Sequence, residues 1–177
     1  MENIILCGCS ASERRIANSL AACASVQYFG ENTIWRRGTG KPEIVICSAV
    51  QLPKTENLPG ILVLGSELRE QEFPPQPLLV PVFDSRSTVA ARLLSLWEGV
   101  AISCGTSPRD TISLASFSGQ KAVISLQRNL TALGGGTVEP RDITVSLGRS
   151  GSVFEVMAFC AVMLLYGADP DREFCLK

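Results

Sequence analysis

The stretch that decides the fold is NIILCGCSASERRIANSL, residues 3–20. An apolar segment over residues 3–7 runs into a Cys-Gly-Cys turn, and a helical pattern follows over residues 11–23. Ser10 and Glu13 form the S-x-x-E pattern of a capping box, which marks the start of a helix. This order of strand, tight turn and helix is the unit from which parallel α/β sheets are built.

The next hundred residues continue this alternation of strand and helix patterns. Residues 86–98 form a helical pattern, with Asp84 or Ser85 at its start and Gly99 at its end. Residues 26–30 predict a strand, and residues 33–37 a short extra strand. Apolar runs rich in Ile, Val and Leu predict buried strands over residues 43–49, 60–66, 77–85 and 100–105. Pro81 within the third of these runs indicates a sheet edge or the end of a strand.

The pattern changes after Cys104. Residues 110–116 and 121–127 alternate apolar and polar side chains, which predicts a β-hairpin, and residues 142–147 predict a further strand. Ser152 and Glu155 form a second capping box before an apolar helix that Gly167 ends. Residues 168–177 read as a tail.

These elements predict one α/β domain over residues 1–177, with a mostly parallel, Rossmann-like sheet, helices on both faces and a late antiparallel hairpin. Residues 1–99 would form the strand and helix half. Residues 100–167 would hold a strand, the hairpin, another strand and the final buried helix. We find no repeat and no linker that would divide the chain.

Composition excludes several functions. The chain has 177 residues, 46% of them hydrophobic and 19% charged, with a net charge of −1. We therefore expect no nucleic acid partner and, because the longest apolar run is too short to span a bilayer, no membrane partner. There is no histidine, so catalytic arrangements and metal sites that need histidine are absent.

Seven cysteines without the spacing of a disulfide-stapled domain indicate a cytoplasmic protein. Cys7, Cys9, Cys47 and Cys104 lie at or just beyond the carboxyl ends of predicted strands and could converge on a metal ion or an iron–sulfur cluster. The C-x2-C spacing of zinc sites is missing, however, and free cysteines often simply pack in cores. We expect no metal and no cofactor. Cys9 and Cys104 are the weak catalytic candidates. A reactive thiolate at Cys9 is more plausible than a metal site, because a helix start lowers the pKa of a thiol.

Two turns could bind a small anionic ligand at the carboxyl edge of the sheet. The first comprises Gly8, Cys9, Ser10 and Ser12, where free backbone N–H groups would face the ligand, and Ser48 follows a strand at the same edge. The second comprises Gly105, Thr106, Ser107 and Asp110. A plain capped turn is the alternative at the first, and a tight turn with local Asp110 hydrogen bonds is the alternative at the second.

The segments GVAISCGTSPRDTISLAS, residues 99–116, and GRSGSVFEVMAFCAVMLLYG, residues 148–167, carry a resemblance. Together they resemble the end of the central ATPase domain of Mur ligases, the ATP-dependent ligases of peptidoglycan precursors. Gly105 matches that family's turn glycine, Gly148 and Arg149 loosely match a loop, and residues 153–167 match its helix. The resemblance covers about the last third of the chain.

The residues that this family uses for ATP do not carry over. Its G-T-N-G-K-[ST] loop would follow the first strand, where this chain has GCSASERR, residues 8–15. Ser150 to Ser152 stand where the family has His-Asn, and its magnesium-binding histidine and carbamylated lysine have no counterpart. The resemblance therefore implies a Mur-ligase-like scaffold that has lost ATP binding.

The leading prediction is a non-catalytic module that binds a small ligand or takes part in an assembly. One alternative is a cysteine-dependent enzyme that acts on a phosphorylated or nucleotide-like ligand. The other is an obligate homo-oligomer with a vestigial pocket, so a second copy or another protein is an open partner class.

Overall fold

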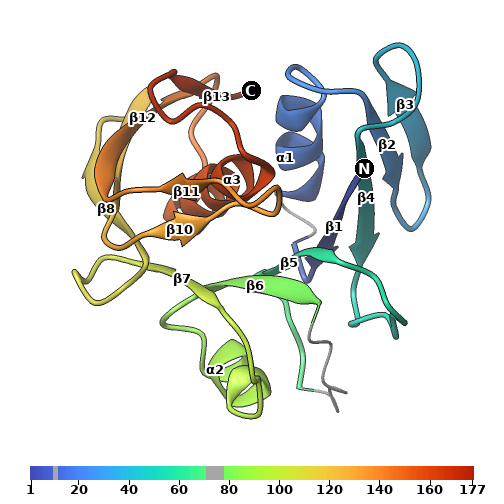
Figure 1. Cartoon of the computed structure of the whole chain (residues 1–177), viewed down its shortest axis with the longest axis horizontal. Coiled ribbons are helices and arrows are strands. Elements are labelled where there is room, and N and C mark those ends of the chain that lie inside the picture. The colour runs from blue at the N-terminus through green and yellow to red at the C-terminus, as the bar shows by residue number, and fades with distance from the viewer. Residues whose placement is uncertain (10–11, 71–77) are drawn as a thin grey trace. The chain divides into compact units, whose positions relative to one another are not determined.

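The computed structural model describes residues 1–9, 12–70 and 78–177 (Figure 1). The chain divides into two compact units, Met1–Ala101 and Ile102–Lys177. Both are built on sheets, and the fold class is the expected α/β class with a mostly parallel, Rossmann-like sheet.

The first unit is a parallel sheet with one antiparallel strand. Its strands follow the order β6-β5-β1-β4-β2-β3, and every neighbouring pair is parallel except β2 and β3. The bounds are β1 Glu2–Cys7, β2 Val26–Phe29, β3 Ile34–Arg37, β4 Ile44–Ala49, β5 Gly60–Leu64 and β6 Leu79–Asp84, with helices α1 Glu13–Leu20 and α2 Thr88–Leu94.

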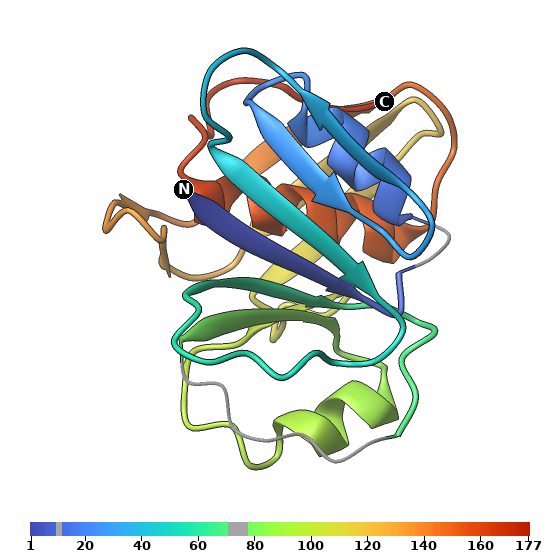
Figure 2. The same ribbon diagram turned by 90° about the vertical axis from the view of Figure 1, so that its right-hand side faces the viewer.

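Strand alternation divides the apolar side chains of this unit between two faces. Ile5 of β1 pairs with Leu62 of β5, and both pack with Ala90 of α2 in one buried cluster. Ile4 and Ile46 lie on the opposite face, where α1 buries its own Ile16. Figure 2 shows α1 behind the blue strands and α2 at the lower edge. Helices therefore lie on both faces of this sheet, as predicted.

The second unit contains the late antiparallel pairs. Its sheet follows the order β13-β12-β9-β8-β7, and a separate pair joins β10 and β11. The bounds are β7 Ile102–Gly105, β8 Ile112–Phe117, β9 Lys121–Leu126, β10 Leu130–Thr131, β11 Thr137–Val138, β12 Arg141–Leu147 and β13 Phe174–Leu176. The predicted hairpin is β8 and β9, which pair antiparallel.

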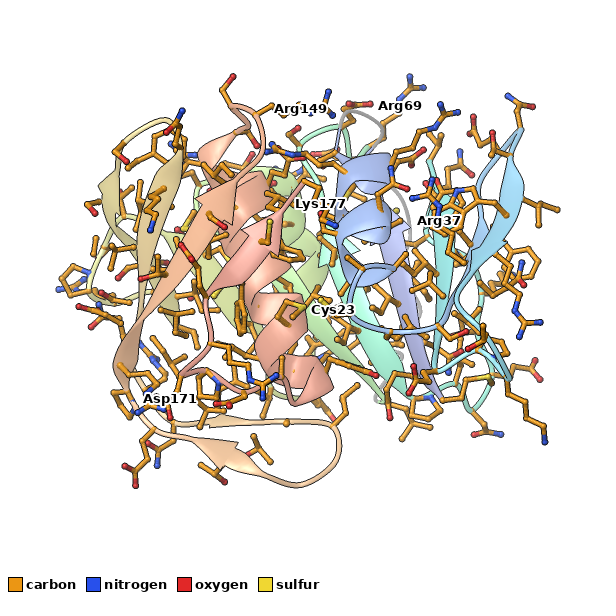
Figure 3. The ribbon with its side chains drawn as sticks, turned by 90° about the horizontal axis from the view of Figure 1, so that it is seen from above. Cys23, Arg37, Arg69, Arg149, Asp171 and Lys177 are labelled. Carbon is orange, nitrogen blue, oxygen red and sulfur yellow. The ribbon has the colours of Figure 1, made fainter. Side chains whose placement is uncertain are left out.

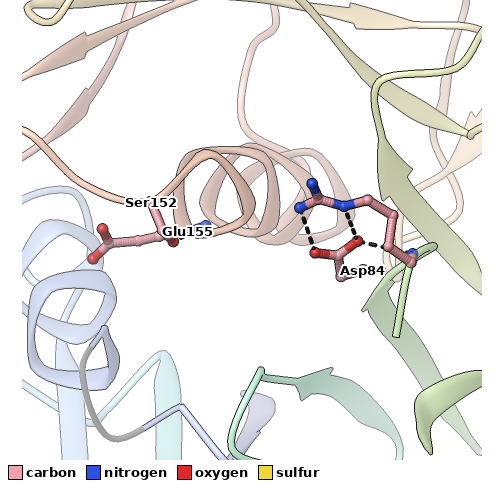
Figure 4. A network of polar contacts seen from close by, with 4 residues as sticks. Asp84, Ser152 and Glu155 are labelled. Carbon is pink, nitrogen blue, oxygen red and sulfur yellow. Dashed lines mark hydrogen bonds and ion pairs between the residues drawn. The ribbon is translucent and has the colours of Figure 1, made fainter. Parts of the chain in front are cut away.

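Helix α3, Val153–Tyr166, lies in the core of the second unit. Residues 155–165 are all buried, and the helix contacts β7, β8, β9, β10 and β13. Ser152 caps its start by accepting the Glu155 N–H at 3.1 Å (Figure 4). Gly167 ends it in the left-handed region at φ 90°, as the glycine at that position predicted.

Three local expectations were wrong. Helix α2 starts after Ser87, whose hydroxyl accepts the Ala90 N–H at 3.2 Å, and it ends before Ser95 rather than at Gly99. The Asp84 carboxylate accepts bonds from Arg86 instead of capping the helix (Figure 4). The tail contains β13, which pairs parallel with β12.

Among the described residues, no helix combines the length and the apolar character needed to cross a membrane.

Replacing Ser152 with Ala should lower the free energy of unfolding by about 1 kcal/mol, because an N–H at the start of α3 loses its acceptor. Urea unfolding followed by circular dichroism measures the change. The control is Ser85→Ala at an exposed serine, which should stay within about 0.5 kcal/mol of the parent. Equal effects of the two substitutions would contradict a capping role for Ser152.

Candidate functional site

The candidate site lies at the carboxyl edge of the first unit's sheet. The parallel strands β5, β1, β4 and β2 are neighbours and end at this edge. From β1 the chain crosses to β2 on one side, and after β4 it passes to β5 on the other side. Ligands of open α/β sheets bind at the carboxyl ends of strands where the chain reverses direction in this way.

A cavity of about 110 Å³ opens at this reversal. Each of the neighbouring strands ends in residues that line it. The lining residues are Gly8 and Cys9 after β1, Glu13 of α1, Glu31 after β2, Ser48, Ala49 and Val50 around the end of β4, and Glu67 and Arg69 after β5. All of them belong to the first unit.

Two glycines let the turns after β1 and β5 pack against each other beside the cavity. A Cβ on Gly65 would lie 2.2 Å from the Gly8 carbonyl oxygen and 2.6 Å from the Cys9 sulfur. Gly8 has φ +64°, and a Cβ there would meet the Leu68 backbone nitrogen at 2.5 Å. The Gly65 N–H donates to the Cys7 carbonyl at 2.8 Å and the Glu67 N–H to the Gly8 carbonyl at 3.1 Å. A side chain at Gly8 or Gly65 would break this packing.

Cys9 lies beneath the cavity as a packed thiol. It is 4% exposed, and its sulfur lies 3.5 Å from the Cys7 carbonyl oxygen. Burial raises the pKa of Cys9 to about 12, and the pKa of Cys7 is raised to about 11 for the same reason. The thiol is therefore protonated near neutral pH, which is the opposite of what a nucleophile needs.

Glu13 connects the start of α1 to β4. Its carboxylate Oε2 accepts the hydroxyl of Ser48, 35 residues away in the chain. Helix α1 begins at Glu13, with Ser12 as a cap residue whose side chain makes no capping hydrogen bond. The predicted capping box pairs Glu13 with Ser10, which lies outside the described residues, so it stays a prediction. Its negative charge lies in the first helical turn, where the helix dipole favours an anion.

Tyr28 of β2 lies next to this pair. Its side chain is 1% exposed and stacks on Trp35 with ring centroids 5.0 Å apart. Burial raises the pKa of Tyr28 to about 12, with smaller influences from the neighbouring Glu13 and Ser48. Within the described part of the chain the hydroxyl makes no hydrogen bond of good geometry, but the Glu13 and Ser48 side chains lie close enough to act on it as hydrogen-bond partners. A Cβ added to Gly30 would lie 2.8 Å from this hydroxyl oxygen, which places it close to the end of β2.

Acidic side chains dominate the cavity lining. Glu13, Glu31 and Glu67 contribute carboxylates, whereas Arg69 contributes the only cation among the lining residues. Figure 3 shows Arg69 at the end of the first unit where α1 begins. The lining therefore carries a net negative charge, which disfavours an anionic ligand.

The structure brings only some of the residues predicted for the first turn to the cavity. Gly8, Cys9 and Ser48 line the cavity. Ser12 is not part of the lining, and its hydroxyl donates to the Cys9 carbonyl at 3.3 Å. Ser10 lies outside the described residues. Sequence reasoning missed Tyr28, Glu31, Glu67 and Arg69 and saw Glu13 only as a capping residue.

The predicted residues of the second turn lie in the second unit. Asp110 is 5% exposed, and its carboxylate accepts the Ser107 N–H at 3.1 Å. The Ser107 hydroxyl in turn accepts the Arg109 N–H at 3.2 Å. Gly105 and Cys104 are buried, while Thr106 is exposed. These hydrogen bonds all lie within the turn, which is typical of a tight turn. That this turn binds a ligand stays a prediction.

In the ranges 1–9, 12–70 and 78–177, no three Cys, Asp or Glu side chains gather closely enough to hold a metal ion. All seven cysteines are free thiols. The four cysteines that follow predicted strands therefore do not assemble a thiolate cluster in the described structure.

No protein-family model and no curated protein matches the sequence. Solved structures do match. A murein peptide ligase from Psychrobacter arcticus has a TM-score of 0.59 at 10% identity over 94% of this chain and 44% of its own. The fold is Mur-ligase-like. The UDP-N-acetylmuramate:L-alanyl-γ-D-glutamyl-meso-diaminopimelate ligase of Neisseria meningitidis follows, with a TM-score of 0.54 at 10% identity over 95% of this chain and 62% of its own.

A UDP-N-acetylmuramoyl-L-alanyl-D-glutamate–2,6-diaminopimelate ligase gives a TM-score of 0.50 at 11% identity, over 93% of this chain and 42% of its own. The Mur-ligase likeness thus extends over nearly the whole chain, beyond the last third that the sequence motifs indicated. The chain spans 42% to 62% of the length of these ligases. At this identity the likeness concerns the fold, and fold alone does not assign an activity.

Replacing Gly65 with Ala should lower the free energy of unfolding by about 1–3 kcal/mol, because the new methyl group would overlap the Gly8 carbonyl and the Cys9 sulfur. Thermal or urea unfolding measures this change in the free energy of unfolding. The control is Gly134→Ala, at which an added Cβ meets nothing within 4 Å. A Gly65→Ala protein as stable as the Gly134→Ala protein would refute the close packing of the two turns.

Iodoacetamide at pH 8 should modify Cys23 and Cys175 first, because these two thiols are exposed. Cys9 and Cys160 should react only after unfolding, because burial raises their pKa. Mass spectrometry of timed samples gives the rates, with a Cys23→Ser, Cys175→Ser double variant as control. Fast labelling of Cys9 in the folded protein would contradict its burial and favour the cysteine-enzyme alternative.

Proposed function

We propose that this chain is a non-catalytic small-ligand-binding module, and that its ligand occupies the cavity between the ends of β1, β4 and β5. One observation supports this most strongly. The cavity lies at the reversal of strand order and is lined by residues from four separate chain segments. Such a position is where open α/β sheets hold ligands.

The absence of catalysis is supported by the chemistry of the lining. Cys9, the thiol at the cavity, is buried and has its pKa raised to about 12. The turn after β1 has the sequence GCSASERR in place of a phosphate-binding loop with its lysine. We therefore propose that the module binds its ligand without cleaving or transferring a nucleotide phosphate.

We also propose a cytoplasmic location. All seven cysteines are free, and two of them, Cys23 and Cys175, are exposed. Exposed free thiols persist in reducing compartments and tend to oxidise outside them.

A thermal-shift screen with a cavity-filling variant tests the proposal. The panel contains alkylammonium salts, amino sugars, UDP-sugars, nucleotides and phosphate. A ligand at about one hundred times its Kd adds about 2.7 kcal/mol, which raises the Tm by several degrees in a chain of this size. The variant Ala49→Phe should lose the shift, because Ala49 lines the cavity.

The matched control is Ala22→Phe at an exposed alanine of the same unit, which should keep the shift. A panel without any stabilising compound would contradict the proposed function. A stabilisation that survives Ala49→Phe would contradict the proposed site.

A further inference from the structure

We propose that the outer edge of β3 binds an extended acidic segment of a partner protein, which joins the sheet as an additional antiparallel strand. β3, Ile34–Arg37, is the last strand in the order of the first unit's sheet and lies next to β2 (Figure 1). None of its residues lines the cavity, so this edge is separate from the proposed ligand site. Three features of β3 support the proposal, namely its unpaired backbone groups, its exposed apolar side chain and its positive charge.

The backbone of β3 presents two residues at this outer edge. Across the turn from β2, the Gly30 N–H donates to the Thr33 carbonyl at 2.8 Å, so the Thr33 carbonyl faces β2. Backbone groups alternate in direction along an antiparallel strand, so those of Trp35 also face β2, whereas the N–H and C=O groups of Ile34 and Arg36 face outward. The described part of the chain supplies no strand on that side. An added antiparallel strand can exchange two hydrogen bonds with each of these two residues.

Apolar side chains at this edge are exposed on the face of the sheet opposite α1. Ile34 is 68% exposed, and Phe29, its partner in the register of β2 and β3, is 42% exposed. Tyr28 points to the other face and is buried there. Figure 2 shows the exposed face toward the viewer, with α1 behind the strands. Ile34 therefore offers an apolar contact to the side chain of a strand that lies beside it.

The charge of the edge selects an acidic partner. Arg36 and Arg37 are exposed at the end of β3, and the exposed Lys41 follows in the next turn. Residues 33–42 contain no acidic side chain. Arg37 lies over the Trp35 ring, 5.0 Å from its centroid, but within the described structure neither arginine forms an ion pair. Carboxylates on an added strand would supply these partners, because opposite charges that face each other across two strands stabilise the pairing.

The same charge disfavours a second copy of this chain as the occupant. Two β3 strands side by side would place the arginines of both copies on neighbouring strands, and like charges there are destabilising. Charged side chains on edge strands prevent such self-pairing. An acidic strand avoids the repulsion and still uses the outward backbone groups of Ile34 and Arg36. Strand addition of this kind takes its affinity from main-chain hydrogen bonds and its specificity from alternate side chains.

The register defines the sequence that this edge should prefer. In an antiparallel pairing, the partner residues opposite Arg37 and Arg36 should be acidic, and the residue opposite Ile34 should be apolar. Read from its N-terminus, the partner segment is then two acidic residues, any residue opposite Trp35, and an apolar residue. The sequence Glu-Glu-Thr-Val meets this pattern.

The test is an NMR titration of the full-length chain with the capped peptide acetyl-Thr-Glu-Glu-Thr-Val-Thr-amide. The backbone amide signals of Ile34 and Arg36 should shift in a saturable way, because their N–H groups gain carbonyl acceptors. The peptide acetyl-Thr-Lys-Lys-Thr-Val-Thr-amide should bind roughly tenfold more weakly. Added sodium chloride should weaken binding of the glutamate peptide, since salt screens exposed charges.

Two N-methylated peptides test the backbone pairing without any change in the protein. In the proposed register the N–H of the peptide valine faces β3, whereas the N–H of the threonine before it faces away. N-methylation of the valine should weaken binding by roughly tenfold, and N-methylation of that threonine should change the affinity little. Equal losses from the two methylations would overturn the strand addition.

Charge reversal in the protein tests the acidic character of the partner. The double variant Arg36→Glu, Arg37→Glu should bind the glutamate peptide roughly tenfold more weakly than the parent does, and the lysine peptide more tightly. The control Lys54→Glu reverses an exposed cation of the same unit outside β3, and its affinities should equal those of the parent. Circular dichroism shows whether the variants fold, and the methylated peptides decide the matter if the double variant does not.

Other outcomes would overturn the proposal in distinct ways. Equal affinity of the parent for the glutamate and lysine peptides would refute the acidic partner. Shifts confined to Gly8 and Ser48 would place the peptide in the cavity instead of at β3. Signals of Ile34 and Arg36 that shift with protein concentration alone, together with a doubled mass by light scattering, would replace the partner protein with a second copy. No saturable shift with millimolar glutamate peptide would refute binding at this edge.

Discussion

The candidate site depends on the close approach of two backbone turns, the one after β1 and the one after β5. Gly65 has room for no side chain, since a Cβ would lie 2.2 Å from the Gly8 carbonyl oxygen. The contact holds the turn of Gly8 and Cys9 beside the segment that carries Glu67 and Arg69. The cavity is the space left at the end of β4 next to this contact, so its shape follows from two glycines.

The turn after β1 and the start of α1 determine the charge at this edge of the sheet. The turn after the first strand is where a phosphate-binding loop would supply backbone N–H groups and a lysine. Here the helix after that turn begins with Glu13, whose carboxylate bonds to Ser48. A negative side chain thus takes the place that a ligand anion would hold. The cavity at this edge is therefore lined mainly by acidic side chains.

Sequence reasoning predicted the strands well and the site only in part. Strands such as β5 were predictable because a continuous apolar run can be buried on both faces of a parallel sheet. Helix α3 was predictable because Ser152 and Gly167 act locally as caps. Helix α2 was misplaced because Asp84 uses its carboxylate for Arg86, and Ser87 does the capping.

The missed site residues have a common physical reason. Glu31, Glu67 and Arg69 lie in loops, and charged loop residues usually face solvent, so nothing near them in the sequence points to a shared cavity. Tyr28 reads as an ordinary strand aromatic, and its nearness to Glu13 and Ser48 follows from tertiary packing. The capping-box pattern correctly placed Glu13 in the first turn of a helix, but it could not show that the Glu13 carboxylate accepts the Ser48 hydroxyl from β4.

The most direct measurement is a crystal structure of the protein grown with the compound that stabilises it most in the thermal-shift screen. The account predicts an ordered ligand in the cavity at the ends of β1, β4 and β5, in contact with Ser48 and Ala49. A cavity filled by the protein's own side chains, or one that holds only water at a saturating concentration of that compound, would contradict it.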